Sequence, residues 1–286
     1  MHTSKPIIQN SLLRVLLFIV LYIVVLVTSG IISGVVLAVL QKQTVSSEIP
    51  VFYYGIFISF AASLVVVFLC CRFIDRRSIK SLGLQWKGFT KERIIGFLTG
   101  VVLCGIIAIV LWLMQIVQWF TDGMDATGLI TGLLLMMAVA FIEELVFRGY
   151  ILNNLMQKMN RNAALGLSAI IFAVLHSLNP GFNLTAFLNI LLAGLVLGVN
   201  YIFSRNLWFG MMLHLSWNYV QGPVLGFKVS GLELPTLLQQ NSKEAILLTG
   251  GEFGLEASWL TTIVFALTLI ILYTAFQKKY NALPSV

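Results

Sequence analysis

Six polar side chains that could do chemistry interrupt otherwise apolar stretches of this chain. They fall in three groups along the sequence, which are Glu143, Glu144 and Arg148, then His176, then His214 and Asn218. An ionisable side chain at the centre of a bilayer costs roughly 2.5–3.5 kcal/mol on insertion scales, so such residues usually face protein or a wet cavity. We therefore expect the three groups to form a functional site.

The types of these residues match the requirements of hydrolysis. A glutamate or a histidine can act as a base towards water, and a histidine and an amide can donate to a developing oxyanion. The same set could instead bind a divalent metal such as zinc, which takes histidine and carboxylate ligands. The His-Glu-x-x-His motif of soluble zinc proteases is absent from the sequence.

Helical spacing separates the roles of the two glutamates. Residues four apart share a helix face, which predicts that Glu144 pairs with Arg148. Glu143 is rotated by about 100° from its neighbour and points towards a different partner. One carboxylate would then be neutralised and structural, and the other would be available for proton transfer. The alternative is a buried ion cluster of all three residues that only fixes helix packing.

The composition places these residues in a membrane protein. Of the 286 residues, 59% are hydrophobic and 10% are charged, against about 25% charged residues in soluble domains. The net charge of +7 therefore concerns orientation in the bilayer rather than nucleic-acid binding. We expect the lipid bilayer as a partner and no nucleic acid, and the sequence indicates no oligomeric state.

A search for about 20 apolar residues per span predicts an all-α, polytopic transmembrane bundle of about eight helices. The predicted segments are 15–40, 51–71, 94–119, 128–147, 163–178, 184–203, 207–225 and 258–276. They form a single integral membrane domain, 1–286, with a motif-bearing core at about 128–225. The longest outer loop, about 226–257, is expected to form a partly ordered cap.

Loop charges predict the orientation of these segments. The stretch 72–93 is rich in lysine and arginine, and placing it in the cytoplasm puts both termini there too. Of the 18 basic residues, only Lys42, Lys228 and Lys243 then fall outside. The positive-inside rule therefore predicts an integral protein of the plasma membrane with both termini cytoplasmic.

The predicted depths of the polar residues in the membrane do not all agree. At 1.5 Å per residue, Glu143 lies about 8 Å and His214 roughly 10 Å from the inner edge of the membrane core, but His176 lies near 20 Å. Either the segment that carries His176 begins deeper in the membrane, or the connection 148–162 dips into it.

The three groups also carry the motifs of a known family. The chain has Glu143-Glu144-Leu-Val-Phe-Arg148, Phe172-Ala-Val-Leu-His176 and His214-Leu-Ser-Trp-Asn218, in that order. In these motifs it resembles the type II CAAX prenyl endopeptidases and their bacterial relatives, the CPBP or Abi proteins. Members of this family are intramembrane glutamic or metallo-endopeptidases.

The resemblance implies roles for these residues. The catalytic candidates are Glu143, Glu144, His176, His214 and Asn218. By analogy, Glu143 and His176 would activate the attacking water. His214 and Asn218 would stabilise the oxyanion. Structural support would come from Glu144, Arg148 and Phe172.

The resemblance also implies a substrate class and raises the question of a cofactor. The substrate would be a membrane-associated protein or peptide. Eukaryotic members remove three residues after a prenylated cysteine, and some bacterial members are linked to bacteriocin self-immunity or peptide maturation. The family is commonly described as metalloproteases. One divalent metal such as zinc would then be bound by Glu143, His176 and His214. We favour activation of water without a metal.

Two other functions compete with the endopeptidase. The first is a non-catalytic membrane protein of the immunity or scaffold type, in which the polar cluster serves packing. The second is a transporter with a proton relay of glutamate and histidine, although the sequence shows neither broken helices nor repeat symmetry.

Overall fold

The computed structural model describes residues 5–41, 48–121, 126–243 and 245–281. Its long helices are α1 (Ser11–Gln41), α2 (Glu48–Leu69), α3 (Thr90–Leu113), α4 (Ala126–Glu144), α6 (Arg161–Leu175), α7 (Leu184–Val199), α9 (Trp208–Tyr219) and α11 (Trp259–Asn281). Short helical pieces extend or connect them, namely η1 (Cys70–Ile74), η2 (Ile79–Leu82), η3 (Leu145–Leu152), α5 (Asn153–Leu155), η4 (His176–Leu178), α8 (Tyr201–Ser204), η5 (Val220–Val224), α10 (Ile246–Thr249), η6 (Gly251–Phe253) and η7 (Leu255–Ala257). The strands are β1 (Val117–Phe120) and β2 (Gln239–Ser242).

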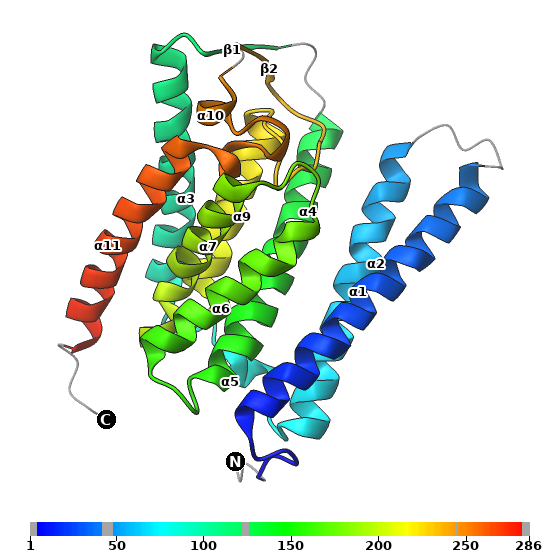
Figure 1. The fold of residues 1–286 in the computed structure, drawn as a ribbon, viewed down its shortest axis with the longest axis vertical. Coiled ribbons are helices and arrows are strands. Elements are labelled where there is room, and N and C mark those ends of the chain that lie inside the picture. The colour runs from blue at the N-terminus through cyan, green and yellow to red at the C-terminus, as the bar shows by residue number, and fades with distance from the viewer. Residues whose placement is uncertain (1–4, 42–47, 122–125, 244, 282–286) are drawn as a thin grey trace.

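Most of these helices are suited to a bilayer. Within the described ranges, seven helical stretches are long and apolar enough to cross a membrane. The stretch formed by α9 and η5 is shorter, and it lies inside the bundle beside α3 and α7 (Figure 1). Large apolar side chains stay exposed along α1, α3 and α11, as contact with lipid requires. The protein is therefore an integral membrane protein, and the expected all-α bundle of about eight helices is confirmed.

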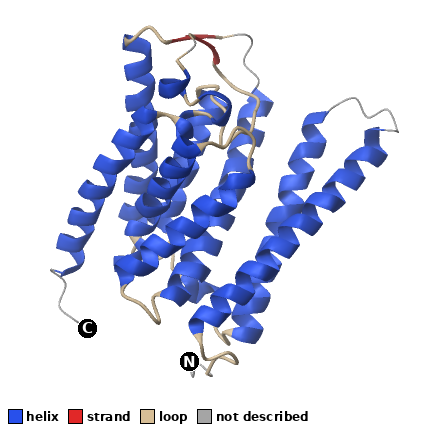
Figure 2. Cartoon of the chain, in the orientation of Figure 1, coloured by secondary structure: helices blue, strands red, loops and turns tan. Residues whose placement is uncertain are grey.

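The connections divide between the two ends of the bundle. The start of α1 and the end of α11 lie at one end, and α10 and both strands lie at the other (Figure 1). Strands β1 and β2 pair antiparallel, with Val117 opposite Ser242, and Figure 2 shows how small this ribbon is beside the helices. The loop 226–257 contains β2, α10, η6 and η7. The described part of this loop therefore forms a cap at that end of the bundle (Figure 1).

Two helix ends differ from the sequence prediction. The third predicted segment extends to residue 119, but α3 ends at Leu113 and β1 follows a turn in which Gln115 has a φ of 54°. The fourth predicted segment ends at 147, whereas α4 continues through η3 and α5 to Leu155. Arg148 looks like a helix boundary in the sequence, yet the helix continues because the pairing of Arg148 with Glu144 allows the charge to be buried.

The longer fourth helix removes the inconsistency in depth. Glu143 lies twelve residues before Leu155, which is about 18 Å along the helix. His176 lies fifteen residues after Arg161, which is about 22 Å. The two side chains therefore reach a similar level, because the connection after residue 148 begins with two further turns of helix.

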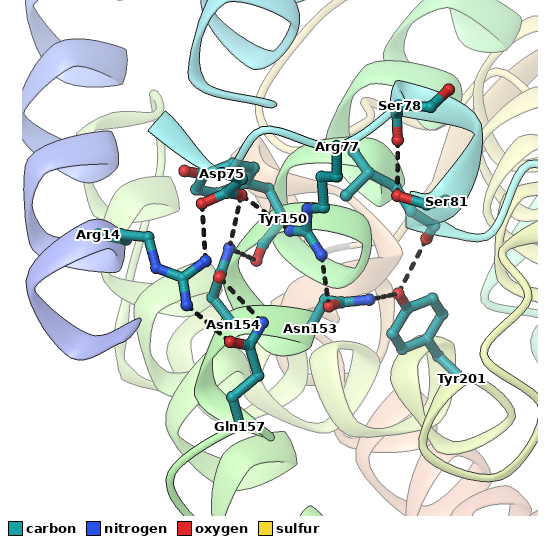
Figure 3. A network of polar contacts seen from close by, with 11 residues as sticks. Arg14, Asp75, Arg77, Ser78, Ser81, Tyr150, Asn153, Asn154, Gln157 and Tyr201 are labelled. Carbon is teal, nitrogen blue, oxygen red and sulfur yellow. Dashed lines mark hydrogen bonds and ion pairs between the residues drawn. The ribbon is translucent and has the colours of Figure 1, made fainter. Parts of the chain in front are cut away.

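A polar network ties the helical hairpin of α1 and α2 to the rest of the bundle (Figure 3). The carboxylate of Asp75 pairs with Arg14 of α1 at 2.8 Å and with Arg77 at 3.0 Å. Arg77 donates to Asn153 of α5 at 2.8 Å, and Asn153 donates to the Tyr201 hydroxyl of α8 at 2.6 Å. Side chains from four parts of the chain are thus fixed at the end where α1 begins.

Close packing of α3 against α9 sets the position of the helix that carries His214. A Cβ atom added at Gly96 would lie 2.4 Å from the Phe209 carbonyl oxygen. One added at Gly100 would lie 2.1 Å from Ser216 Oγ and 2.6 Å from the Leu213 carbonyl oxygen. Glycine is therefore required at both positions for this approach of the two backbones.

Candidate active site

The three polar groups of the sequence meet at one cavity inside the bundle. The cavity has a volume of about 230 Å³. Its walls are mostly apolar and come from α2, α4, α6, α7, α9, α11 and the loop that follows η5. Its polar lining residues are Glu143, His176, Asn179, His214, Asn218, Ser230 and Glu256.

Glu143 is the carboxylate that reaches this cavity. Its Oε2 atom lies 3.8 Å from Nε2 of His176 and 3.8 Å from Nε2 of His214. The same oxygen is buried and has no hydrogen-bond partner among the described residues. These separations are too long for direct hydrogen bonds, but they are short enough for one water molecule to bridge the groups.

The orientation of His176 follows from its place directly after the carboxyl end of α6. Its Nδ1 lies 2.8 Å from the carbonyl oxygen of Phe172, one turn earlier. Because a carbonyl can only accept, Nδ1 carries a proton and donates, and in the neutral ring Nε2 keeps a free lone pair. The ring also packs on Phe172, with centroids 4.3 Å apart. Nε2 is thereby directed at Glu143.

Glu144 lies outside the cavity lining and acts on it through His214. The Glu144 side chain is fully buried, and its Oε1 accepts from Nδ1 of His214 at 3.2 Å. The Nε2 atom of His214 consequently faces Glu143. The separation of the two glutamates that helical geometry predicts is present, since adjacent carboxylates contact different groups.

Arg148 neutralises Glu144 and links three helices. Its Nη1 donates to Glu144 Oε1 at 2.8 Å, as the spacing of four predicts, and its Nη2 donates to the Gly194 carbonyl of α7 at 3.0 Å. The guanidinium carbon lies 4.6 Å from the ring centre of Phe172 on α6, a cation–π contact. Phe172 thus supports both Arg148 and His176.

Asn218 follows His214 by one turn on α9 and also lines the cavity. Only 3% of its surface is exposed, and its Oδ1 has no hydrogen-bond partner in the described part of the chain. A buried amide without partners is costly. Its hydrogen-bonding capacity therefore stays available to a molecule in the cavity.

Donor spacing tests whether the site fits a metal ion. Neighbouring donors of a tetrahedral zinc site lie roughly 3.3 Å apart, given bonds of about 2.0–2.1 Å, whereas Glu143 Oε2 lies 3.8 Å from each histidine nitrogen. No group of three or more His, Cys, Asp or Glu side chains in the described ranges could hold a metal ion. In this arrangement Glu143, His176 and His214 do not fit a metal ion.

Sequence reasoning missed Glu256 and Ser230. Both lie in the cap on the predicted outer side, yet both line the cavity. Glu256 is 6% exposed and accepts from the backbone nitrogen and the hydroxyl of Ser230 at 2.5 and 2.8 Å. The one available signal was the position of Glu256 between Leu255 and Ala257 in a glycine-rich stretch, which does not distinguish a buried loop from an exposed one.

A helical membrane bundle that encloses a glutamate, two histidines and an asparagine defines the class, an integral membrane protein with an intramembrane polar site. Residues 125–220 match the family described as type II CAAX prenyl endopeptidase Rce1-like. The matched segment contains all three motifs, so the resemblance is confirmed there, and it supports a CAAX-type intramembrane protease in general terms. No curated protein matches the chain.

Proposed function

We propose that this protein is an intramembrane endopeptidase that hydrolyses a peptide bond in a membrane-associated protein or peptide. The observation that carries the proposal is the convergence of Glu143, His176 and His214 within 3.8 Å contacts in one cavity. The family match of the same segment gives independent support.

Glu143 and His176 activate the attacking water. A water between Glu143 Oε2 and His176 Nε2 donates a proton to one of them as its oxygen attacks the carbonyl carbon of the scissile bond. The surrounding apolar walls strengthen these electrostatic interactions by excluding other water. The proton is later delivered to the leaving nitrogen as the C–N bond breaks, and the resulting carboxylic acid and amine exchange a proton to become a carboxylate and an ammonium group.

His214 and Asn218 stabilise the oxyanion. Both lie on one face of α9, four residues apart. Since Nδ1 of His214 already donates to Glu144, its Nε2 can donate to the oxyanion only from the cationic ring. The Asn218 amide supplies a neutral donor beside it. Glu144, Arg148 and Phe172 position these groups without touching the substrate.

Orientation in the membrane forms part of the proposal. We place the protein in the plasma membrane, and the positive-inside rule puts the basic 72–93 loop and both termini in the cytoplasm. The cap that contributes Ser230 and Glu256 to the cavity lies at the opposite end of the bundle (Figure 1).

The test is cleavage of synthetic apolar peptides by the purified protein in detergent, followed by mass spectrometry. Wild type should release defined fragments, and Glu143→Ala, His176→Ala and His214→Ala should each slow cleavage at least about 100-fold, within the range that acid–base groups contribute. Equal membrane insertion and thermal unfolding of all four proteins is the control. Full activity in all three variants would overturn the proposal and favour the immunity or scaffold function.

A further inference from the structure

The cavity of the proposed protease has an unbalanced charge. Two carboxylates line it, Glu143 and Glu256, and no lysine or arginine in the described ranges does so. Arg148, the nearest buried cation of the motif residues, is already paired with Glu144 at 2.8 Å and lies outside the lining. Apart from the His214 ring, which donates to the oxyanion in its cationic form, an anionic group of a substrate would therefore find no cation in this cavity, whereas a cationic group would find two carboxylates.

Glu256 is held in a defined position at the cap side of this cavity. Ser230 donates twice to its Oε2, from the backbone nitrogen at 2.5 Å and from the hydroxyl at 2.8 Å. Ser230 has a φ of 48°, and the next residue, Gly231, packs so closely that a Cβ would lie 2.2 Å from the Pro180 carbonyl oxygen. The turn that holds Glu256 is thus fixed by its own tight packing.

The other oxygen of Glu256 is unused by the protein. No hydrogen bond or ion pair involves Oε1 in the described part of the chain, although the residue is only 6% exposed. A buried carboxylate that lacks a cation is costly. Burial accordingly raises the pKa of this carboxyl above its ordinary value, while the hydrogen bonds from Ser230 act in the opposite direction.

We propose that Glu256 recognises a cationic group of the substrate, either a lysine or arginine side chain or a peptide amino terminus. This inference rests on the endopeptidase function proposed above. The substrate would be an apolar peptide segment with one positive charge near the scissile bond, because the remaining walls of the cavity are apolar. A free substrate carboxylate would be disfavoured at this position.

A purely structural role for Glu256 makes a different prediction. If the carboxylate only held the turn at Ser230, glutamine would serve almost as well, because its side-chain oxygen can accept the same two hydrogen bonds. Glu256→Gln therefore removes the charge while the support of the turn is kept. Glu252→Gln is the matched control in the same loop, since that side chain is 80% exposed and pairs with the surface residue Lys228.

The experiment compares peptides that differ by one charge. Apolar peptides carry lysine or arginine, or the neutral analogues norleucine or citrulline, at successive positions, and a second set has free or acetylated amino termini. Wild type, Glu256→Gln, Glu252→Gln and Glu143→Gln are incubated with them in detergent. We expect wild type and Glu252→Gln to prefer one charged series at least about tenfold in kcat/KM, equivalent to about 1.4 kcal/mol, and Glu256→Gln to lose that preference.

The outcomes separate the two proposals. Preference for the lysine and arginine series identifies a side-chain cation, and preference for free amino termini identifies the terminal ammonium. Cleavage without charge preference, or a preference that survives in Glu256→Gln, overturns the recognition role and leaves the protease standing. Absence of any cleavage by wild type beyond that of Glu143→Gln overturns the protease, and the recognition role with it.

Discussion

At the scale of single residues, the adjacent side chains of Glu143 and Glu144 make different contacts. Glu143 has a buried oxygen without a partner in the cavity, whereas the Oε1 atom of Glu144 accepts from both Arg148 and His214 outside the cavity lining. Consecutive helical positions differ by about 100° in direction, so one helix turn can supply both a reactive group and a group that orients its partner. The same geometry predicts different consequences when each is neutralised.

Glu144→Gln should destabilise the protein, in contrast to Glu143→Gln. It leaves Arg148, which is 2% exposed, without a countercharge. Breaking a buried pair in this way costs about 3–5 kcal/mol, so the thermal unfolding temperature in detergent should fall clearly. Glu143→Gln removes no hydrogen bond, and its contacts with the two histidine rings are 3.8 Å long, so this variant should unfold close to wild type. Equal unfolding temperatures for the two variants would contradict the assignment.

Removal of metal ions should leave the proposed activity intact. The spacing of Glu143, His176 and His214 does not suit a metal ion, and water activation is derived from these groups alone. Extended dialysis of the purified protein against a chelator should therefore leave kcat/KM unchanged within about twofold. Loss of activity that returns on addition of zinc, with unchanged folding, would instead establish the metal-dependent alternative.

The residues of the site were predictable from the sequence to different degrees. An ionisable residue in an apolar helix is conspicuous, so Glu143, His176 and His214 stand out from their neighbours in the sequence alone. Glu256 does not, because it lies in a loop of mixed polarity. Its burial depends on Ser230, 26 residues earlier, and no local pattern encodes such a contact.

At the scale of helices and strands, the lengths of the helices decide whether the residues of the site meet. The apolar runs located the long helices, but helix ends depend on tertiary contacts. The fourth helix continues through Arg148 because partners on other helices satisfy that side chain, and it widens into the π-helical η3 directly after the glutamates. Widened turns of this kind are frequent at functional sites. Strand β1 was missed because its sequence, VQWF, contains no charged residue and follows the apolar run of α3 within a few residues.

Gly100 should be essential for the position of α9. In Gly100→Val, the new side chain would collide with Ser216 and with the backbone of Leu213. Because these neighbours flank His214, both stability and cleavage should fall, each measurable on purified protein by thermal unfolding and peptide digestion. Gly105→Val on the same helix is the control, since a Cβ there meets nothing within 4 Å. A loss in both variants alike would point to helix propensity rather than to packing.

The whole molecule combines an intramembrane site with a cap that closes one end of the bundle. The first and last long helices start and end on the same side (Figure 1), which agrees with an even number of crossings. The side itself was inferred from loop charge, because a helical bundle has the same internal contacts in either orientation. Orientation is therefore the property that most needs a direct measurement.

Labelling of single cysteines should reveal this orientation. In a background in which Cys70, Cys71 and Cys104 are replaced by alanine, Glu252→Cys should react with a membrane-impermeant maleimide in intact cells. Lys87→Cys should react only after permeabilisation. Both positions are exposed in the structure, so accessibility differs only through the membrane. The reverse pattern would place the cap in the cytoplasm.

If the protein is an endopeptidase, the peptides it releases in cells should depend on Glu143. The most direct measurement compares cells that express wild type or Glu143→Gln at equal levels, by mass spectrometry of membrane-associated and secreted peptides. We expect new peptide ends that occur with wild type and disappear with Glu143→Gln. Identical peptide ends in both, with both proteins inserted to the same extent, would contradict the endopeptidase function.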